Sequence, residues 1–226
     1  MRSAVFSLIA LLLLALLATA CDQPRPVQVV AGADRLPGLY WEPPKPLSRA
    51  VLLVHMLGRS KEDWISLATR LRQAGYGVLA IDLREQGRTG APELLADLRA
   101  GFDFLRAEKK VDAARIGIVG ASIGANAALN LAAQEPLVRL TALLSPGLNY
   151  RGVTTEPALR DYGARPLFLA AAEEDLASAR AVRRLAQVAQ GTSVTKLYPG
   201  RAHGTDLLTV VPGLEQELLA FLQAHL

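Results

Sequence analysis

A short glycine-serine motif between two apolar segments places the strongest constraint on the fold of this chain. Residues 120–124 are Gly-Ala-Ser-Ile-Gly, after a strand-like run at 115–119 and before a helix-like run at 125–133. A serine at such a turn needs small residues two positions to either side, because strand and helix pass close together there. The turn would expose the hydroxyl of Ser122 and aim the first helical amides at a developing oxyanion. The chain has 18 glycines, so the pentapeptide could occur by chance; its position between a strand-like and a helix-like run is what makes it informative.

A serine hydroxyl needs a base to act as a nucleophile, and in this kind of site the base follows it in the chain. Of the three histidines, His55 precedes the serine and ends an apolar run, and His225 is the penultimate residue. His203 lies in a loop after the strand-like residues 193–197, from which it can reach across the sheet. We therefore predict that His203 is the base and that His55 is structural.

The carboxylate that orients this base should follow the preceding strand. Residues 166–172 have the pattern of a buried strand, and Glu173, Glu174 and Asp175 come directly after it. Asp175 is favoured because it stands far enough into the turn for the chain to bend back toward the base, and Glu174 is the alternative. Asp206 is too close in sequence to the base to hold its far ring nitrogen.

Backbone amides, not side chains, would form the oxyanion hole. One N–H would come from Ile123, directly after the nucleophile. The other would come from Leu57, or from its neighbour Met56, in the loop that follows the apolar residues 50–54.

These features together resemble the α/β-hydrolase superfamily, in its compact, lidless branch of small esterases and dienelactone-hydrolase-like proteins. The resemblance runs from about Gly38 to the C-terminus. Residues 51–58, Val-Leu-Leu-Val-His-Met-Leu-Gly, look like the family's oxyanion strand, and residues 82–88, Asp-Leu-Arg-Glu-Gln-Gly-Arg, are similar to its Asp-x-Arg-Gly-His-Gly loop.

The chain departs from the family pattern at three positions. Met56 stands where a glycine is usual, and Glu85 and Gln86 replace Gly-His. Classical dienelactone hydrolases use a cysteine at the position of Ser122, so their substrate is not carried over to this chain.

We expect an α/β fold in which helices cover both faces of a mostly parallel central sheet, since strand and helix patterns alternate along the chain. Residues 146–165 are all that separates the strand ending near Ser145 from the acid-bearing strand, which excludes a large cap domain. Tyr150 and Arg151 in this insert are either rim residues of the cleft or ordinary loop surface. The expected strands are 27–31, 37–41, 50–54, 76–81, 115–119, 166–172 and 193–197, and the expected helices are 62–74, 91–109, 125–133, 176–190 and 213–224.

The N-terminal segment predicts an export signal that ends at a cysteine. Residues 1–20 hold one charge, Arg2, then an uncharged apolar stretch and small residues before Cys21, the only cysteine. This is the pattern of a secretory signal peptide, and it resembles a bacterial lipobox, which implies that Cys21 becomes a lipidated N-terminus. An uncleaved membrane anchor is the alternative, because residues 4–20 are uncharged. Asp22 resembles a signal that retains lipoproteins at the inner membrane.

We therefore expect three parts: a lipoprotein signal peptide at 1–20, the lipidated cysteine with a linker and leading edge at 21–36, and an α/β-hydrolase domain at 37–226. The protein would be anchored in the bacterial cell envelope and face the periplasm or the exterior. The formal net charge is only +4 and no basic tract is present, which excludes a nucleic-acid partner. No metal-ligand cluster or dinucleotide fingerprint is found, so no metal and no organic cofactor is expected.

The expected activity is that of a serine hydrolase, a carboxylesterase that cleaves small-molecule or accessible acyl esters through Ser122, His203 and Asp175. A thioesterase, amidase or peptidase of the same fold is an alternative. A non-catalytic envelope lipoprotein that uses the fold as a binding platform is another.

Overall fold

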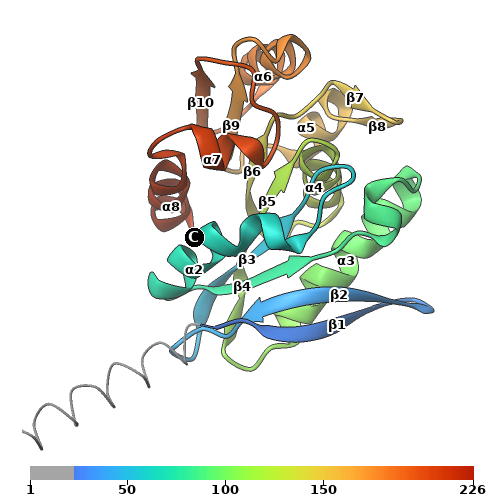
Figure 1. The fold of residues 1–226 in the computed structure, drawn as a ribbon, viewed down its shortest axis with the longest axis vertical. Coiled ribbons are helices and arrows are strands. Elements are labelled where there is room, and N and C mark those ends of the chain that lie inside the picture. The colour runs from blue at the N-terminus through green and yellow to red at the C-terminus, as the bar shows by residue number, and fades with distance from the viewer. Residues whose placement is uncertain (1–22) are drawn as a thin grey trace, which may run out of the picture.

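An eight-stranded sheet forms the centre of the structure, a computed structural model that describes residues 23–226 (Figure 1). The strand order is β1-β2-β4-β3-β5-β6-β9-β10. β1 and β2 form an antiparallel hairpin, β2 is antiparallel to β4, and the other neighbours are parallel. The strands are β1 (Arg25–Ala31), β2 (Asp34–Trp41), β3 (Ser48–Val54), β4 (Gly77–Ile81), β5 (Val111–Ala121), β6 (Val138–Leu144), β9 (Leu167–Ala172) and β10 (Ser193–Tyr198).

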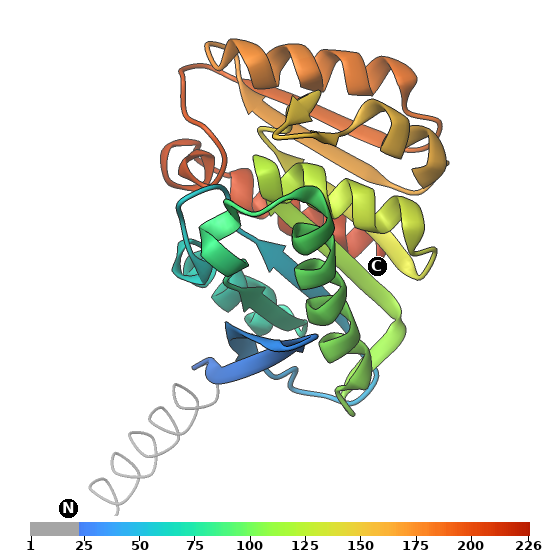
Figure 2. The same cartoon turned by 90° about the vertical axis from the view of Figure 1, so that its right-hand side faces the viewer.

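Helices cover both faces of this sheet. α3, α4, α5 and α6 pack on one face, which Figure 2 views, and α2, α7 and α8 pack on the other. The predicted fold class, a mostly parallel sheet between two helical layers, is therefore confirmed. The helices are α2 (Ile65–Gln73), α3 (Ala91–Ala107), α4 (Ile123–Gln134), α5 (Glu156–Tyr162), α6 (Leu176–Val188), α7 (Asp206–Val210) and α8 (Leu214–His225), with short 3-10 turns η1 (Lys61–Trp64) and η2 (Arg84–Gly87).

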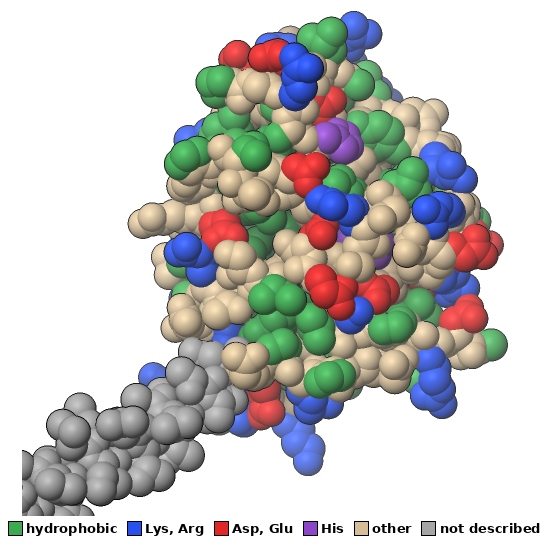
Figure 3. Space-filling model, viewed as in Figure 1, with side chains coloured by type: hydrophobic (Ala, Val, Ile, Leu, Met, Phe, Trp, Pro, Cys, Tyr) green, Lys and Arg blue, Asp and Glu red, His purple; other side chains and the backbone are tan. Residues whose placement is uncertain are grey.

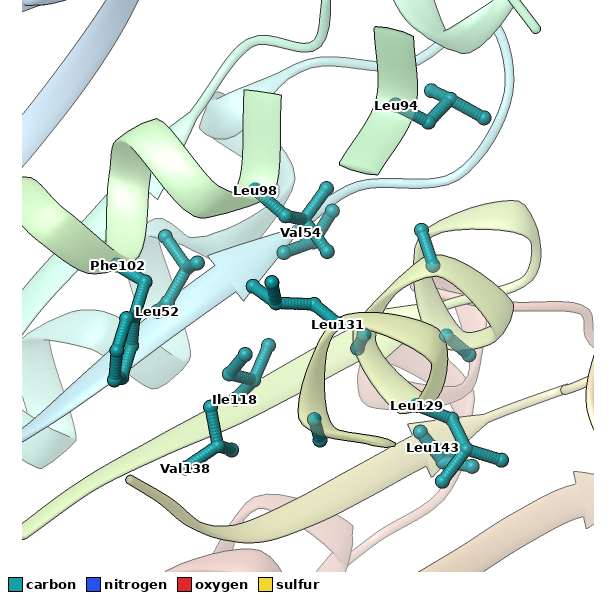
Figure 4. Packing of buried hydrophobic residues seen from close by; sticks show 14 of the residues in the cluster. Leu52, Val54, Leu94, Leu98, Phe102, Ile118, Leu129, Leu131, Val138 and Leu143 are labelled. Carbon is teal, nitrogen blue, oxygen red and sulfur yellow. The ribbon is translucent and has the colours of Figure 1, made fainter. Parts of the chain in front are cut away.

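The central strands are buried on both faces because they lie between these layers. Along β3, Leu52 and Val54 join the core under α3 and α4, whereas Val51 and Leu53 join the core under α2. Successive side chains of a strand point to opposite faces, so a strand covered on both sides is apolar throughout. Figure 4 shows Val54 beside Leu98 of α3, and Leu52 beside Phe102 of the same helix. The two cores hold the strand ends, and the loops that follow them, in fixed positions.

The parallel strands give the sheet two different ends. We call the end at which β3, β5, β6, β9 and β10 stop the carboxyl end, and the end at which they start the amino end. Arg25 at the start of β1 pairs with Tyr40, and Trp41 at the end of β2 pairs with Val78 near the start of β4. The chain therefore enters the sheet at its amino end.

Some elements differ from the sequence expectation. The insert at 146–165 forms no large cap, as expected, but it contains a small hairpin that was not predicted, β7 (Asn149–Tyr150) with β8 (Val153–Thr154), followed by α5. The pattern did not predict α7, and the helix expected from residue 62 begins with the η1 turn and becomes α-helical only at Ile65. These short elements lack the hydrophobic period on which the prediction of longer helices rests.

The predictions for residues 1–20 and for Cys21 lie outside the described residues. Within residues 23–226, no helix is both long enough and apolar enough to cross a membrane. The expected boundary between residues 36 and 37 falls inside β2, and the β1–β2 hairpin belongs to the same sheet as the rest of the chain. On the face viewed in Figure 3, acidic and basic side chains are interspersed.

Candidate active site

Ser122 occupies the sharp turn between β5 and α4. Its backbone is in a strained conformation, with φ of 53° and ψ of −118°, which non-glycine residues rarely adopt. A Cβ on Gly120 would lie 2.6 Å from the carbonyl carbon of Gly124, and one on Gly124 would lie 2.5 Å from the carbonyl oxygen of His55. The two glycines thus allow helix, strand and neighbouring loop to approach closely enough to hold the serine in this turn.

Three side chains from distant parts of the sequence meet at the carboxyl end of the sheet. Nε2 of His203 lies 2.8 Å from Oγ of Ser122, and Nδ1 of the same ring lies 2.6 Å from Oδ2 of Asp175. They follow β5, β9 and β10, which lie close together in the sheet. The carboxylate accepts the proton of Nδ1, so Nε2 is free to accept the hydroxyl proton of the serine. This arrangement can convert the hydroxyl into a nucleophile.

The other acids considered for the orienting role point elsewhere. Glu174 forms an exposed ion pair with Arg201 at 3.3 Å, and Asp206 pairs with Arg59. Neither carboxylate bonds the ring of His203, whose one carboxylate contact among residues 23–226 is Asp175. The structure thus brings Asp175 to the ring of His203, and places the carboxylates of Glu174 and Asp206 on arginine partners instead.

The two amides predicted for the oxyanion hole donate to no acceptor within residues 23–226. Ile123 is the first residue of α4, where helical N–H groups have no intrahelical partner. Leu57 lies in the loop after β3, and its neighbour Gly58 donates to the carbonyl of Gln86 at 2.9 Å. The amides of Ile123 and Leu57 are therefore available to a ligand, whereas that of Gly58 is not.

The buried imidazole of His55 fixes the peptide before Leu57. Its Nε2 accepts the N–H of Leu83 at 2.9 Å, so Nδ1 carries the proton and donates to the carbonyl of Met56 at 2.7 Å. Burial lowers the pKa of His55, which favours this neutral form. In a trans peptide the carbonyl and the following N–H point in opposite directions. The bond to Met56 therefore also sets the direction of the Leu57 N–H.

The loop that carries His203 is bonded to residues on both of its sides. The N–H of Gly204 donates to the hydroxyl of Ser145 at 2.9 Å. Ser145 is fully buried at the end of β6 and has a positive φ of 50°. A Cβ on Gly204 would collide with the sulfur of Met56, so the histidine loop also packs closely on the loop after β3.

A polar network joins the same two loops further from the serine. The hydroxyl of Thr205 donates to Oδ2 of Asp63 at 2.5 Å, and that oxygen also pairs with Nε of Arg59 at 3.1 Å. Arg59 in turn contacts the carboxylate of Asp206. Nothing local in the sequence indicates these contacts, because Asp63 and Thr205 are 142 positions apart.

Tyr150, in the insert after β6, lies beside the histidine. Its ring meets that of His203 edge to face, with centroids 6.2 Å apart, and its hydroxyl lies 3.0 Å from Oγ of Ser178. Burial raises the pKa of Tyr150. Arg151 instead donates to the backbone carbonyl of Arg88 at 2.9 Å. Tyr150 is therefore part of the wall of the site, whereas Arg151 joins two loops.

An open hollow of about 690 Å³ adjoins His203, lined by the loop before it and by α7. Its other lining residues are Pro199, Gly200, Arg201, Ala202, Asp206, Thr209 and Val210. In residues 23–226, no group of three or more histidine, cysteine and acidic side chains is arranged to hold a metal ion.

A family model described as "Alpha/beta hydrolase family" matches residues 51–211, which is more than half of the chain. An uncharacterized protein of Mycobacterium tuberculosis is 37% identical over 101 residues, 43% of this chain and 36% of that protein. The aligned segment thus spans about a third of that protein's length.

Solved structures share the fold. A dienelactone hydrolase from Anabaena variabilis superposes with a TM-score of 0.75 at 23% identity and covers 90% of this chain and 99% of that one. The esterase Pf2001 of Pyrococcus furiosus superposes with a TM-score of 0.73 at 18% identity and covers 92% of each chain.

Proposed function

The chain belongs to the alpha/beta hydrolase family, and from this premise we propose that it is a serine hydrolase that cleaves carboxylic esters. The observation that carries the proposal is the unbroken pair of hydrogen bonds from Ser122 through His203 to Asp175. The similarity in fold to an esterase and to a dienelactone hydrolase supports the same class of reaction.

In the proposed first step, Oγ of Ser122 attacks the ester carbonyl carbon while Nε2 of His203 takes the hydroxyl proton. Asp175 holds the Nδ1 proton and stabilises the imidazolium. The tetrahedral intermediate collapses as His203 gives its proton to the leaving alkoxide, which departs as the alcohol. In the second step His203 takes a proton from water, the hydroxide attacks the acyl-enzyme, and the carboxylic acid leaves as Ser122 regains its proton.

The amides of Ile123 and Leu57 are the proposed donors to the negative oxygen of each tetrahedral intermediate. Preorganised donors of this kind stabilise a charge that exists only near the transition state. The bond from His55 to Met56 then has a catalytic consequence, because it holds the Leu57 N–H in its direction before any substrate arrives.

We propose small or accessible acyl esters as the substrate class. The insert between β6 and β9 forms only the β7–β8 hairpin and α5, so the hollow beside His203 is open to solvent. An open cleft gives little apolar enclosure for a long acyl chain.

The test is labelling with a fluorophosphonate, which reacts only with an activated serine. The wild-type protein should be labelled and Ser122→Ala should not, while Ser66→Ala, which removes an exposed serine on α2, should label normally. A wild-type protein that stays unlabelled would overturn the proposal in favour of a binding platform.

A panel of matched ester, thioester and amide substrates tests the substrate class. Faster turnover of the thioester or the amide would replace the esterase assignment.

We also propose that the protein is a lipoprotein of the bacterial cell envelope, anchored through Cys21. The apolar stretch and the small residues before the lone cysteine support this. Intact-mass measurement of detergent-extracted protein should show loss of residues 1–20 and addition of lipid, and Cys21→Ser should abolish both. A wild-type mass that retains residues 1–20 without lipid would instead identify an uncleaved anchor.

A further inference from the structure

At the amino end of the sheet, a proline-rich loop holds a hydrophobic side chain out in solvent. Residues 43–47, Pro-Pro-Lys-Pro-Leu, connect β2 to β3. Leu47 is 69% exposed and has a positive φ of 54°, a conformation that a leucine rarely adopts. An exposed leucine with a positive φ lowers the stability of the folded state, so a role outside the fold would explain why leucine stands here.

Hydrogen bonds hold this loop in its conformation. The carbonyl of Leu47 accepts a bond from Arg115 at 2.5 Å, and the hydroxyl of Ser48 donates to the carbonyl of Lys45 at 2.8 Å. The N–H of Ser48 donates to the carbonyl of Lys110 at 2.9 Å. Together with the prolines, which restrict the backbone, these bonds present Leu47 on a preformed loop.

Positive charge surrounds the exposed leucine. The hollow beside it, of about 630 Å³, is lined by Lys45, Arg49 and Arg115 and by no acidic residue. Arg115 is paired with Asp112 at 2.8 Å, but within residues 23–226 neither Lys45 nor Arg49 forms an ion pair. Arg49 instead donates to neutral oxygens of two other residues. Leu47 at the tip of the loop is therefore flanked by two cations without an ion-pair partner among the described residues, Lys45 in the loop and Arg49 in β3.

The chain enters the domain at this same end. β1 begins at Arg25, which pairs with Tyr40 shortly before the loop. Cys21 precedes Arg25 by four positions, so an anchor at Cys21 would hold Arg25 within about 14 Å of the membrane, at 3.3–3.6 Å per extended residue. The amino end of the sheet is then the part of the domain nearest to the lipid.

We propose that this end of the domain, with Leu47, Lys45 and Arg49 at its centre, docks on an anionic phospholipid surface. Leu47 would enter the boundary between headgroups and acyl chains, and the two cations would contact lipid phosphates. The lipid at Cys21 would tether the domain to the membrane, and Leu47 with the two cations would set its orientation there. Because the catalytic residues lie at the opposite end of the sheet, docking turns their cleft toward solvent. This inference rests on the proposed anchor for its geometry.

The experiment places the full chain, with its natural N-terminus, in vesicles of phosphatidylcholine and phosphatidylglycerol that carry a lipid-bound quencher. A thiol-reactive fluorophore is attached at Leu47→Cys or, as a matched control at the carboxyl end, at Leu176→Cys; the two leucines are 69% and 72% exposed. Lipidated Cys21 has no free thiol and takes no label. Quenching should be about threefold or more stronger at residue 47, because only that label reaches the acyl boundary. Equal quenching at the two positions would overturn the proposal.

A second comparison tests the role of charge. In the Leu47→Cys background, Lys45→Gln with Arg49→Gln should reduce quenching about twofold or more, and replacing phosphatidylglycerol by phosphatidylcholine should do the same, since each removes electrostatic attraction. Arg180→Gln with Arg183→Gln, two exposed positions on α6, should leave quenching unchanged. If quenching changes neither with the lipid charge nor with the substitution of Lys45 and Arg49, the proposed headgroup contact is overturned. The mass of the same sample shows whether Cys21 is lipidated, so failure of the anchor is distinguished from failure of docking on an anchored chain.

Discussion

The carboxyl and amino ends of the sheet are formed by the same strands, but their loops make different contacts. At the carboxyl end, loops from distant parts of the chain are bonded to one another, as Gly204 is to Ser145 and Thr205 is to Asp63. At the amino end, the loop at 43–47 is fixed to the domain mainly through its backbone carbonyls, while Leu47 points outward. The first arrangement positions groups against each other, and the second leaves side chains free for an external surface.

This difference predicts that substitutions at the carboxyl end act on turnover and those at the amino end do not. The largest expected effect is that of Ser122→Ala, which removes the attacking oxygen. Turnover of a soluble ester should fall by about 10⁴–10⁶, while the thermal midpoint stays nearly unchanged. Steady-state kinetics and thermal unfolding measure the two quantities. Retention of more than about a tenth of the wild-type rate is incompatible with the proposed nucleophile.

Asp175→Asn should have the next largest effect, because the amide cannot stabilise the imidazolium of His203 as the carboxylate does. Turnover at neutral pH should fall by about 10²–10⁴. Glu174→Gln, which changes an exposed carboxylate paired with Arg201, is the matched control and should be mild, since exposed charges are screened. The opposite ranking of these two variants would transfer the orienting role to Glu174.

Thr205→Val tests whether the bonds between loops matter for catalysis. The change removes the donor to Asp63 and keeps the shape of the side chain. We expect kcat to fall about tenfold with little change in KM, because small displacements of a catalytic group are costly. Thr205→Ser should restore the rate, and Thr195→Val, at an exposed site on β10, should be neutral. A wild-type kcat in Thr205→Val would show that the network only supports the fold.

His55 adds a dependence of stability on pH. Burial lowers the pKa of His55 in the folded protein, so the unfolded chain binds the proton first as the pH falls. The contribution of the neutral imidazole is therefore present above about pH 6.5 and is lost on acidification below it. The midpoint should fall by about 2–4 °C for each kcal/mol lost. His55→Asn, which retains a donor toward Met56, should show a smaller fall between pH 7.5 and 5.5; an equal fall would assign the dependence to other groups.

The smallest effect is expected at the amino end. Lys45→Gln with Arg49→Gln should leave kcat on a soluble ester, measured in detergent, within about twofold of wild type, because distant sites act independently. A larger loss of kcat would show that the two ends of the sheet are energetically coupled. The expectation that only the carboxyl end affects turnover would then be wrong.

The sequence predicted the fold well because its long elements carry a clear hydrophobic period. The motif at 120–124 and the order of the chain also named Ser122, Asp175 and His203, which the structure brings together. Chain order is informative here because the carboxyl ends of neighbouring parallel strands meet at one end of the sheet.

The contacts between loops at the carboxyl end could not be predicted, because no motif or hydrophobic period in the sequence indicates them. Ser145 supports the histidine loop through a positive φ that is unusual for serine, and the motif does not encode it. The bond between Asp63 and Thr205 depends on the packing of two loops whose lengths and directions are set by tertiary structure. The exposure of Leu47 could not be predicted either, since only the folded structure distinguishes an exposed leucine in a loop from a buried one.

The close packing around the turn at Ser122 also limits which substitutions the chain can accept. Gly120 and Gly124 leave no space for even a methyl group, since each would drive a carbon atom into neighbouring backbone. Ser122, between them, is held by its backbone, and its side chain extends into the cleft. A mutation that exchanges its oxygen for sulfur therefore keeps the architecture, whereas a side chain at either glycine forces neighbouring backbone to shift. Over successive mutations the reactive atom can be replaced more readily than the turn that presents it.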